Sequence, residues 1–448
     1  MFDLDTSGWG ARNAHDPTIV RGDDGLWYMF STDAAAGVDR IPAGAHVRTS
    51  PDLVTWTFRG TALDGVPQQA GEWSGAAGLW APEVVRWPDA GGDERDAEPR
   101  WHMYYSASTF GSRTSAIGLA TASAPSGPWT DRGIVIATHH DRDAVNAIDA
   151  AVVFDADGAP WMIYGSFFGG IHAVELSIET GKRLRDEPGA LIARRPRSVD
   201  GAIEGAYVVR RDGRYVLFVS YDSLADTYSV RVGVSDAITG PYLDHQGREL
   251  TSPAEADAES TGTKVLGGLR FPGGVGLIAP GHNSIFHDGD ATFMVHHVRL
   301  ADAPTQHEAQ VRRVHWTASG WPLVSPHPYA GAERERLASP EPIAGEWDAV
   351  RFAPEVPAMV DAERVTVIAE GESDGDAVGV QLVVCPDAGS LNAAQAGSLR
   401  LSKGPSADIV LDAVVFGAWD PVAQRTVLAF SGIDRDGVVW SGSKAVTP

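Results

Sequence analysis

Three carboxylates open three short apolar segments of this chain. Asp16 stands in HDPTIV, Asp149 in NAIDAAVVF and Glu204 in AIEGAYVV. Like charges held close together raise the pKa of one carboxyl group, which keeps a protonated acid beside an ionised base at neutral pH. Hydrolysis of a glycosidic bond needs such a pair, because one group protonates the leaving oxygen and the other activates water. The three residues are therefore candidates for acid–base chemistry if the fold brings them together.

The segments that carry these residues belong to a repeat that occurs five times. A polar residue opens a short apolar strand, a turn follows, and an aromatic-rich strand comes next, as in HDPTIV–RGDDG–LWYMFST. Glu83 in WAPEVVRW and His282 in GHNSIF open the second and fifth copies. Repetition of a roughly four-stranded unit, with no sustained helical period, predicts a five-bladed β-propeller. A β-sandwich with irregular strands is the alternative.

A propeller would bring the five opening residues to one end of its central channel, if the first strand of each repeat is innermost. Glu83 fits this position either as a member of the site or as a group behind it. His282 at an axial position would hold a cation or orient a substrate. Because the chain has no HExxH or CxxC pattern, a hard and mostly hydrated cation is favoured over a transition metal.

Aromatic and amide side chains near the repeat starts suit a sugar ligand. Sugars present flat apolar faces that pack on rings, and hydroxyls that need polar partners. Trp80 in GLWAPE and Phe110 in STFGS are predicted on loops, where they would bind substrate or belong to the propeller core. Asn146 in NAID and Ser166 in YGSFFGG are candidates for hydrogen bonds to the substrate.

The repeats end near residue 330, and the pattern then changes. A polar, proline-bearing connector leads to short alternating strands with DG-type turns from about residue 345. We therefore expect an all-β chain, with a propeller catalytic domain over residues 1–330 and a small antiparallel β-barrel or sandwich over residues 345–448. The second domain carries no evident acid–base set, so an accessory role is expected.

The formal net charge of −23 disfavours nucleic acid and anionic membranes as partners and favours a neutral ligand. The single cysteine, Cys385, rules out an intramolecular disulfide. The first residues, MFDLDTSGWG, lack a basic segment followed by an apolar one, and no apolar run approaches the ~18 residues of a membrane span. We therefore expect a cytoplasmic protein.

Eight segments together resemble glycoside hydrolase family 43, and within it the arabinan endo-1,5-α-L-arabinanases. They are HDPTIV, LWAPEV, STFGSRTSAIGLAT, NAIDAAVVFDADG, YGSFFGGI, AIEGAYVV, VGVSDAITGPYLDHQG and GHNS, between about Asn13 and Arg299. The resemblance implies a five-bladed propeller and single-displacement, inverting hydrolysis of α-1,5-linked L-arabinan or arabino-oligosaccharides. It also implies that the C-terminal part is the small β-barrel appended to larger members.

The resemblance also implies individual roles. Asp16 would be the general base, Glu204 the general acid, and Asp149 the residue that orients Glu204 and raises its pKa. His282 would correspond to an axial histidine near a calcium ion. The chain departs from the family pattern at Gly205 and Ala206, where AIEAPY-like text is usual, and also at Glu83 and Ala150.

Two other readings fit the same residues. The first is an exo-acting α-L-arabinofuranosidase or β-xylosidase on the same fold. The second is a non-catalytic glycan-binding propeller, against which the retained acid and base candidates argue, because binding alone needs no such pair.

Overall fold

The computed structural model describes residues 6–36, 41–88, 101–251, 253–331, 343–368, 395–402 and 408–445, and Cys385 lies outside these ranges. Strands dominate the described elements, which also include the short helix α1 (Gln68–Ser74) and brief 3-10 turns. No helix in these ranges is long and apolar enough to cross a membrane.

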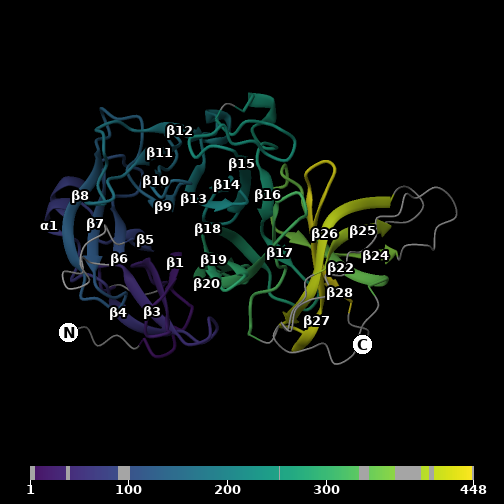
Figure 1. Cartoon of the computed structure of the whole chain (residues 1–448). Coiled ribbons are helices and arrows are strands. Elements are labelled where there is room, and N and C mark those ends of the chain that lie inside the picture. The colour runs from purple at the N-terminus through teal and green to yellow at the C-terminus, as the bar shows by residue number, and fades with distance from the viewer. Residues whose placement is uncertain are drawn as a thin grey trace.

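Five antiparallel sheets form the propeller, and Figure 1 shows them arranged around a common centre. Blades one to three contain β1 (His15–Arg21), β2 (Trp27–Thr32), β3 (His46–Ser50), β4 (Thr57–Thr61), β5 (Trp80–Arg86), β6 (Trp101–Ala107), β7 (Ser115–Ala122), β8 (Thr130–Thr138), β9 (Ala151–Phe154), β10 (Pro160–Tyr164), β11 (Ile171–Glu175) and β12 (Ala190–Ala193). Blades four and five contain β13 (Ile203–Arg211), β14 (Arg214–Tyr221), β15 (Ser229–Ser235), β16 (Thr263–Leu266), β17 (Leu269–Arg270), β18 (Leu277–Asp288), β19 (Ala291–Leu300), β20 (Ala303–Trp316) and β21 (Pro322–Val324). The predicted five-bladed propeller is confirmed.

The aromatic-rich strands lie in the middle of the blades, where both faces pack against neighbouring sheets. Every residue of β2 (WYMFST) and of β6 (WHMYYSA) is buried, whereas the outer strand β4 is largely exposed. Phe30 of β2 and Met103 of β6 share one hydrophobic cluster between blades one and two. Burial on both faces explains why these strands read as continuous apolar runs rather than as alternating ones.

The innermost strands β1, β5, β9, β13 and β18 face the centre and contact one another. Each has a residue with positive φ, near its start in four blades and in the middle of the long strand β18: Asp16 (51°), Ala81 (37°), Asp149 (60°), Gly205 (57°) and His282 (44°). In four of the blades the pairing register shifts at this point, as expected for a β-bulge. Non-glycine residues held in this region cost about 1–3 kcal/mol each, and such strain is concentrated at functional sites.

The chain ahead of β1 joins the last blade and so closes the ring. The backbone N–H of Asn13 donates to the carbonyl of His307 at 2.9 Å, and the N–H of Ala309 donates to the carbonyl of Ala11 at 2.9 Å. Blade five is thereby fixed beside blade one, which places β18 against β1.

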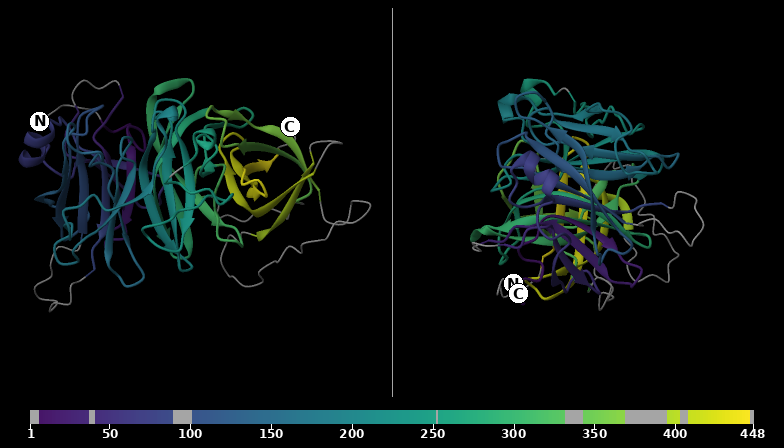
Figure 2. Two further views of the ribbon diagram at one scale, coloured as in Figure 1. Left: turned by 90° about the horizontal axis from the view of Figure 1, so that it is seen from above. Right: turned by 90° about the vertical axis from the view of Figure 1, so that its left-hand side faces the viewer.

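The C-terminal strands form a closed barrel, the first of the two forms expected. Its strands are β22 (Gly345–Phe352), β24 (Glu363–Ile368), β25 (Gln395–Ser402), β26 (Asp408–Asp420), β27 (Arg425–Asp434) and β28 (Val439–Lys444). The barrel lies beside blades four and five, as Figure 2 shows, and Phe352 and Phe416 share a core with Val265 and Ile285 of the propeller. The short strand β23 (Val360–Asp361) leaves the barrel and pairs with β17 in blade five.

Candidate active site

The bulges arrange the axial residues in two layers, and this decides between the two positions that the sequence left open for Glu83. HDPT of blade one and WAPE of blade two share a proline, so Ala81 takes the place of Asp16 in blade two. Glu83 lies two residues further along the strand and is equivalent to Thr18, whose Oγ1 donates to Glu83 Oε2 at 2.9 Å. Glu83 is therefore not a fifth residue of the upper layer, but a buried member of the layer behind it.

Asp16 is held by polar contacts to both of its carboxylate oxygens. Thr32 Oγ1 donates to Oδ2 at 2.6 Å, while the Nδ1 atoms of His15 and His282 lie 2.9 and 3.1 Å from Oδ1. Burial would raise the pKa of Asp16, but the two imidazoles outweigh it and hold the pKa well below the usual value. Asp16 is thus an ionised carboxylate at neutral pH, as a general base must be.

His282, from blade five, forms an ion pair with Asp16, from blade one. Its backbone N–H donates to Ser220 Oγ at 2.8 Å, which fixes the bulge in β18. Burial lowers the pKa of His282, but the carboxylates of Asp16, Asp149 and Glu204 overcome this and raise the pKa to about 9. The imidazole is therefore a cation at neutral pH.

Glu204 points into the cavity described below and accepts two hydrogen bonds. Ser166 Oγ donates to Oε2 at 2.8 Å, and the hydroxyl of Tyr228 donates to Oε1 at 3.0 Å. Burial raises the pKa of Glu204, and the charge of Asp16 adds to this, so the net shift is upward although both hydrogen bonds oppose it. A raised pKa is what a general acid requires at neutral pH.

Asp149 lies directly behind Glu204 and contacts the backbone that carries it. The N–H of Gly205 donates to Asp149 Oδ2 at 3.2 Å, and the N–H of Asp149 donates to Ser106 Oγ at 3.0 Å. Burial and the charge of Glu204 raise the pKa of Asp149 to about 7, although the cationic His282 opposes the shift. Asp149 thus orients the main chain next to Glu204.

Glu83 connects three blades below this layer. It accepts hydrogen bonds from Thr18 in blade one, from the backbone N–H of Val152 in blade three and from the hydroxyl of Tyr207 in blade four. Burial raises its pKa to about 8 despite these three donors. Glu83 is therefore uncharged at neutral pH, and its contacts suit a group that holds the inner strands together.

A cavity of about 610 Å³ opens over blades two to four. Its lining includes the general-acid candidate and all four residues predicted to bind substrate: Glu204, Trp80, Phe110, Asn146 and Ser166. Phe110 is 90% exposed, so it does not belong to the propeller core, and Trp80 is the first residue of β5 rather than part of a loop. The structure brings these residues together, and their roles remain predictions.

The surroundings of His282 fit a hydrated cation rather than a directly ligated one. A doubly protonated imidazole has no lone pair to offer a metal, and Nδ1 already faces Asp16. The side chains of Asp16, Asp149 and Glu204 nevertheless place three carboxyl groups around this imidazole. Carboxyl oxygens are ligands that calcium prefers.

A second group with metal-like spacing is better explained by hydrogen bonding. Ligand atoms of His15, Asp16 and His297 all lie within 4.8 Å of one another. The backbone N–H of Asp16 donates to His297 Nδ1 at 3.3 Å, and the rings of His15 and His297 stack at 3.7 Å. These contacts engage His297 Nδ1, and they orient Asp16.

Several residues of the site escaped the sequence analysis. They are His15, Ser220, Tyr228 and His297. The histidine next to Asp16 in HDP was one available signal, and the pair HH in the strand after GHNS was another, because His297 pairs with Gly281 across the sheet. Ser220 and Tyr228 carry no such signal, since only the pairing of β13 with β14, and of β14 with β15, brings them near Glu204.

An ionised carboxylate and a carboxyl group of raised pKa at the axis of a propeller, beside a cavity with exposed aromatic rings, define a hydrolase of glycosidic bonds. Residues 10–322 match the glycosyl hydrolases family 43, and the chain belongs to this family. The family resemblance seen in the sequence is confirmed.

Three similar proteins extend over most of the chain or over the propeller. The extracellular endo-alpha-(1->5)-L-arabinanase 2 of Bacillus subtilis is 26% identical over 96% of this chain and 93% of its own length. An extracellular exo-alpha-(1->5)-L-arabinofuranosidase of Cellvibrio japonicus is 31% identical over 70% of this chain and 86% of its own length. The crystal structure of a family 43 glycoside hydrolase from Bacillus licheniformis superposes with a TM-score of 0.77 at 26% identity, covering 97% of this chain and 98% of that chain.

The expectation of a cytoplasmic protein is wrong. The similar arabinanase of Bacillus subtilis and arabinofuranosidase of Cellvibrio japonicus are both named as extracellular enzymes. The expectation rested on the composition of the first ten residues, and that feature alone does not determine the compartment.

Proposed function

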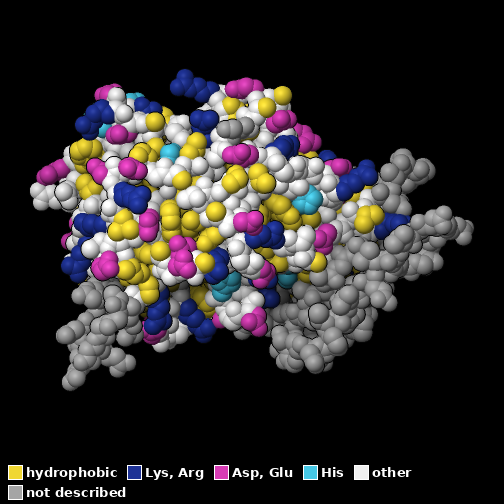
Figure 3. Space-filling view, turned by 45° about the horizontal axis from the view of Figure 1, so that its top comes forward, with side chains coloured by type: hydrophobic (Ala, Val, Ile, Leu, Met, Phe, Trp, Pro, Cys, Tyr) yellow, Lys and Arg dark blue, Asp and Glu magenta, His cyan; other side chains and the backbone are white. Residues whose placement is uncertain are grey.

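We propose that this protein hydrolyses α-1,5-linked L-arabinan or its oligosaccharides with inversion at the anomeric carbon. The observation that carries the proposal is the opposite pKa shift of two carboxyl groups at one axis, downward for Asp16 and upward for Glu204. The names of the Bacillus and Cellvibrio relatives support α-1,5-linked arabinose polymers as the substrate. A neutral polymer also suits the surface, where acidic and basic side chains are interspersed on the face shown in Figure 3.

In this mechanism Asp16 takes a proton from a water molecule as that water attacks the anomeric carbon. Glu204 gives its proton to the glycosidic oxygen, so the C–O bond breaks and the leaving sugar departs as an alcohol. Asp149 holds the N–H of Gly205 and so fixes the position of Glu204. His282 keeps Asp16 ionised between turnovers.

We further propose that a largely hydrated calcium ion lies near His282. The support for it is the set of three carboxyl groups around that imidazole. A bound cation would offset their mutual repulsion and fix the upper layer of axial residues. Dialysis against a chelator should then lower both the melting temperature and the activity, and calcium should restore both; unchanged values would remove the ion from the proposal.

The substrate and the residues are tested together on linear α-1,5-arabinan. Asp16→Ala and Glu204→Ala should each lower kcat by at least about 100-fold, the usual contribution of a positioned acid or base. Proton NMR of the first product should show the β-anomer, because inversion converts the α linkage. Near wild-type sugar release by both variants would contradict the assignment, and release of the α-anomer would contradict inversion.

An exo-acting enzyme is the second candidate, because the Cellvibrio relative is named as one. The product pattern separates the two: a ladder of oligosaccharides indicates internal cleavage, and arabinose or a single short product indicates attack at a chain end. We also infer that the enzyme acts outside the cell, as the names of the relatives indicate for them.

A further inference from the structure

The cavity at the active site extends from Glu204 to a wall to which the C-terminal region contributes. Leu224 and Thr227, in the loop after β14, line this far part together with Glu259. Pro357, which lies beyond the first barrel strand, also lines it. One wall of the cavity is therefore built partly outside the five blades.

Two buried basic side chains of blade four hold the segment that carries Pro357. Arg231 Nη2 donates to the carbonyl of Pro354 at 2.7 Å, and Lys264 Nζ donates to the carbonyl of Val356 at 2.6 Å. Both side chains are almost inaccessible to solvent. The bond from the charged Arg231 is of the stronger kind, and a buried donor left without its acceptor is costly, so this connection is fixed.

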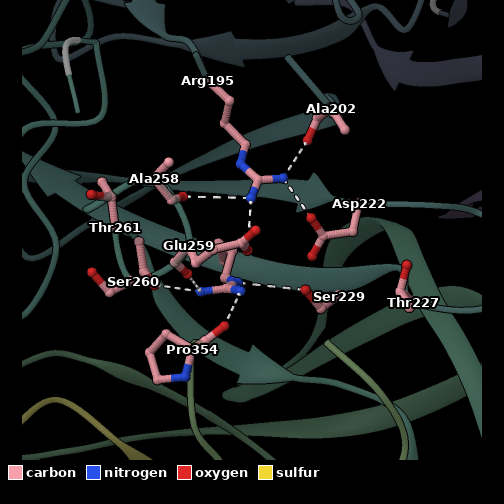
Figure 4. Close-up of polar contacts among 12 residues, drawn as sticks. Arg195, Ala202, Asp222, Thr227, Ser229, Ala258, Glu259, Ser260, Thr261 and Pro354 are labelled. Carbon is pink, nitrogen blue, oxygen red and sulfur yellow. Dashed lines mark hydrogen bonds and ion pairs between the residues drawn. The ribbon is translucent and has the colours of Figure 1, made fainter. Parts of the chain in front are cut away.

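The same arginine connects the segment to the opposite side of the wall. Arg231 Nη1 donates to the carbonyls of Glu259 and Gly262, both at 3.3 Å. Figure 4 shows Glu259 and Pro354 close together in this network. The backbone of the wall from blade four and the backbone that precedes Pro357 thus meet on one guanidinium group.

A second buried arginine fixes the acidic side chains of the wall. Arg195 Nη1 donates to Asp222 Oδ1 at 2.6 Å, and its Nη2 lies 3.4 Å from Glu259 Oε2, as Figure 4 shows. Its guanidinium also lies over the ring of Tyr221, 4.2 Å from the centroid. Asp222 stands two residues after Ser220, the cross-strand partner of Glu204. At about 3.3 Å per residue the wall begins about 7 Å along the strand from that partner.

We propose that this wall is a distal sugar-binding subsite, and that the connection to the C-terminal barrel thereby takes part in substrate recognition. Pro357 and Leu224 offer apolar surface to one face of a sugar ring. Thr227 and the half-exposed Glu259 offer hydrogen-bonding groups to its hydroxyls. The ligand is an arabinose unit of the chain other than the one whose bond is cleaved, so the inference rests on the proposed function.

The test compares kcat/KM on arabinotriose and on arabinohexaose for three variants. Pro357→Trp places a large ring in the wall, and Glu259→Gln weakens its acceptor while keeping its shape. Each should lower kcat/KM on the hexaose by roughly tenfold, the size of one lost sugar contact, and leave the value on the triose within about twofold. Pro421→Trp, at an exposed proline in the barrel turn after β26, is the matched control and should change neither.

The outcomes separate this inference from the proposed function. If the unmodified protein cleaves neither arabinan nor the oligosaccharides, the proposed function and the subsite fall together. If it cleaves them and both wall variants lose activity equally on short and long substrates, or behave like Pro421→Trp, the subsite alone is overturned. Both wall variants alter side chains that reach solvent. Melting temperatures equal to that of the unmodified protein would show that a loss of kcat/KM does not come from misfolding.

Discussion

Asp16 Oδ1 and His282 Nδ1 lie 3.1 Å apart, although blades one and five contribute them from opposite ends of the propeller sequence. Each sits at a bulge with positive φ, 51° for Asp16 and 44° for His282. The pair keeps the carboxylate ionised and the imidazole charged against the cost of burial. This relationship determines which of the axial carboxyl groups is available to accept a proton.

Replacing His282 by Gln should therefore move the acidic limb of the pH profile. Loss of the cation raises the pKa of Asp16, and Asp16 must be ionised to act as base, so activity should fall off at a higher pH than in the unmodified protein. The measurement is kcat/KM on linear arabinan between pH 3 and pH 8. His172→Gln, in blade three, is the matched control, and an acidic limb shared by all three proteins would contradict the ion-pair role.

Replacing Ser166 by Ala should move the alkaline limb of the pH profile of kcat/KM to higher pH. The hydroxyl donates to Glu204 and lowers its pKa, so its removal raises that pKa and keeps the acid protonated to higher pH. A hydrogen bond of about 1 kcal/mol corresponds to slightly less than one pH unit. Ser177→Ala removes a similar hydrogen bond, from Ser177 to the exposed Glu179, and should leave the profile unchanged. An alkaline limb that moves downward would refute the assignment of Glu204 as the acid.

Replacing Gly205 by Ala should lower kcat by roughly 10- to 100-fold, because a misplaced catalytic group reduces the rate by this order. Gly205 has a φ of 57°, and a Cβ there would lie 3.0 Å from His282 Cα. The backbone that carries Glu204 must then shift. Gly213→Ala, in the turn between β13 and β14, has a φ of 81° and open space around its Cβ. If both variants lost the same amount of activity, backbone strain at a positive φ, rather than contact with His282, would explain the lower kcat.

Glu83 should make the protein less stable as the pH rises. Its pKa of about 8 in the folded state lies above the unfolded value near 4.5, so the folded state binds the extra proton between these values. Stability is therefore fully present below about pH 4.5, declines as the pH rises toward 8, and changes little through this group at higher pH. Glu83→Gln keeps the shape without the titration, and its melting temperature should fall less between pH 5 and pH 9. A variant with the same pH dependence as the unmodified protein would exclude this carboxyl group as the source.

The sequence by itself determined the repeat, the number of blades and the three carboxylates, because strand periodicity and turn residues are local properties. It also placed Trp80, Phe110, Asn146 and Ser166 near the repeat starts, and these residues all line the cavity. The sequence pattern aligned Glu83 with Asp16, whereas the structure aligns Ala81 with Asp16 and places Glu83 two residues further along the strand. The pattern could not show this, because the bulge depends on backbone angles that the residue types alone do not specify.

The tertiary structure decided which residues touch. Closure of the ring brings the backbone N–H of Asp16 to His297, 281 residues away in sequence, and the pairing of β13 with β14 places Ser220 opposite Glu204. The attachment of the barrel to blades four and five decides that Pro357 reaches the cavity. These contacts depend on how blades pack around a common axis, and no local pattern in the chain encodes such long-range packing.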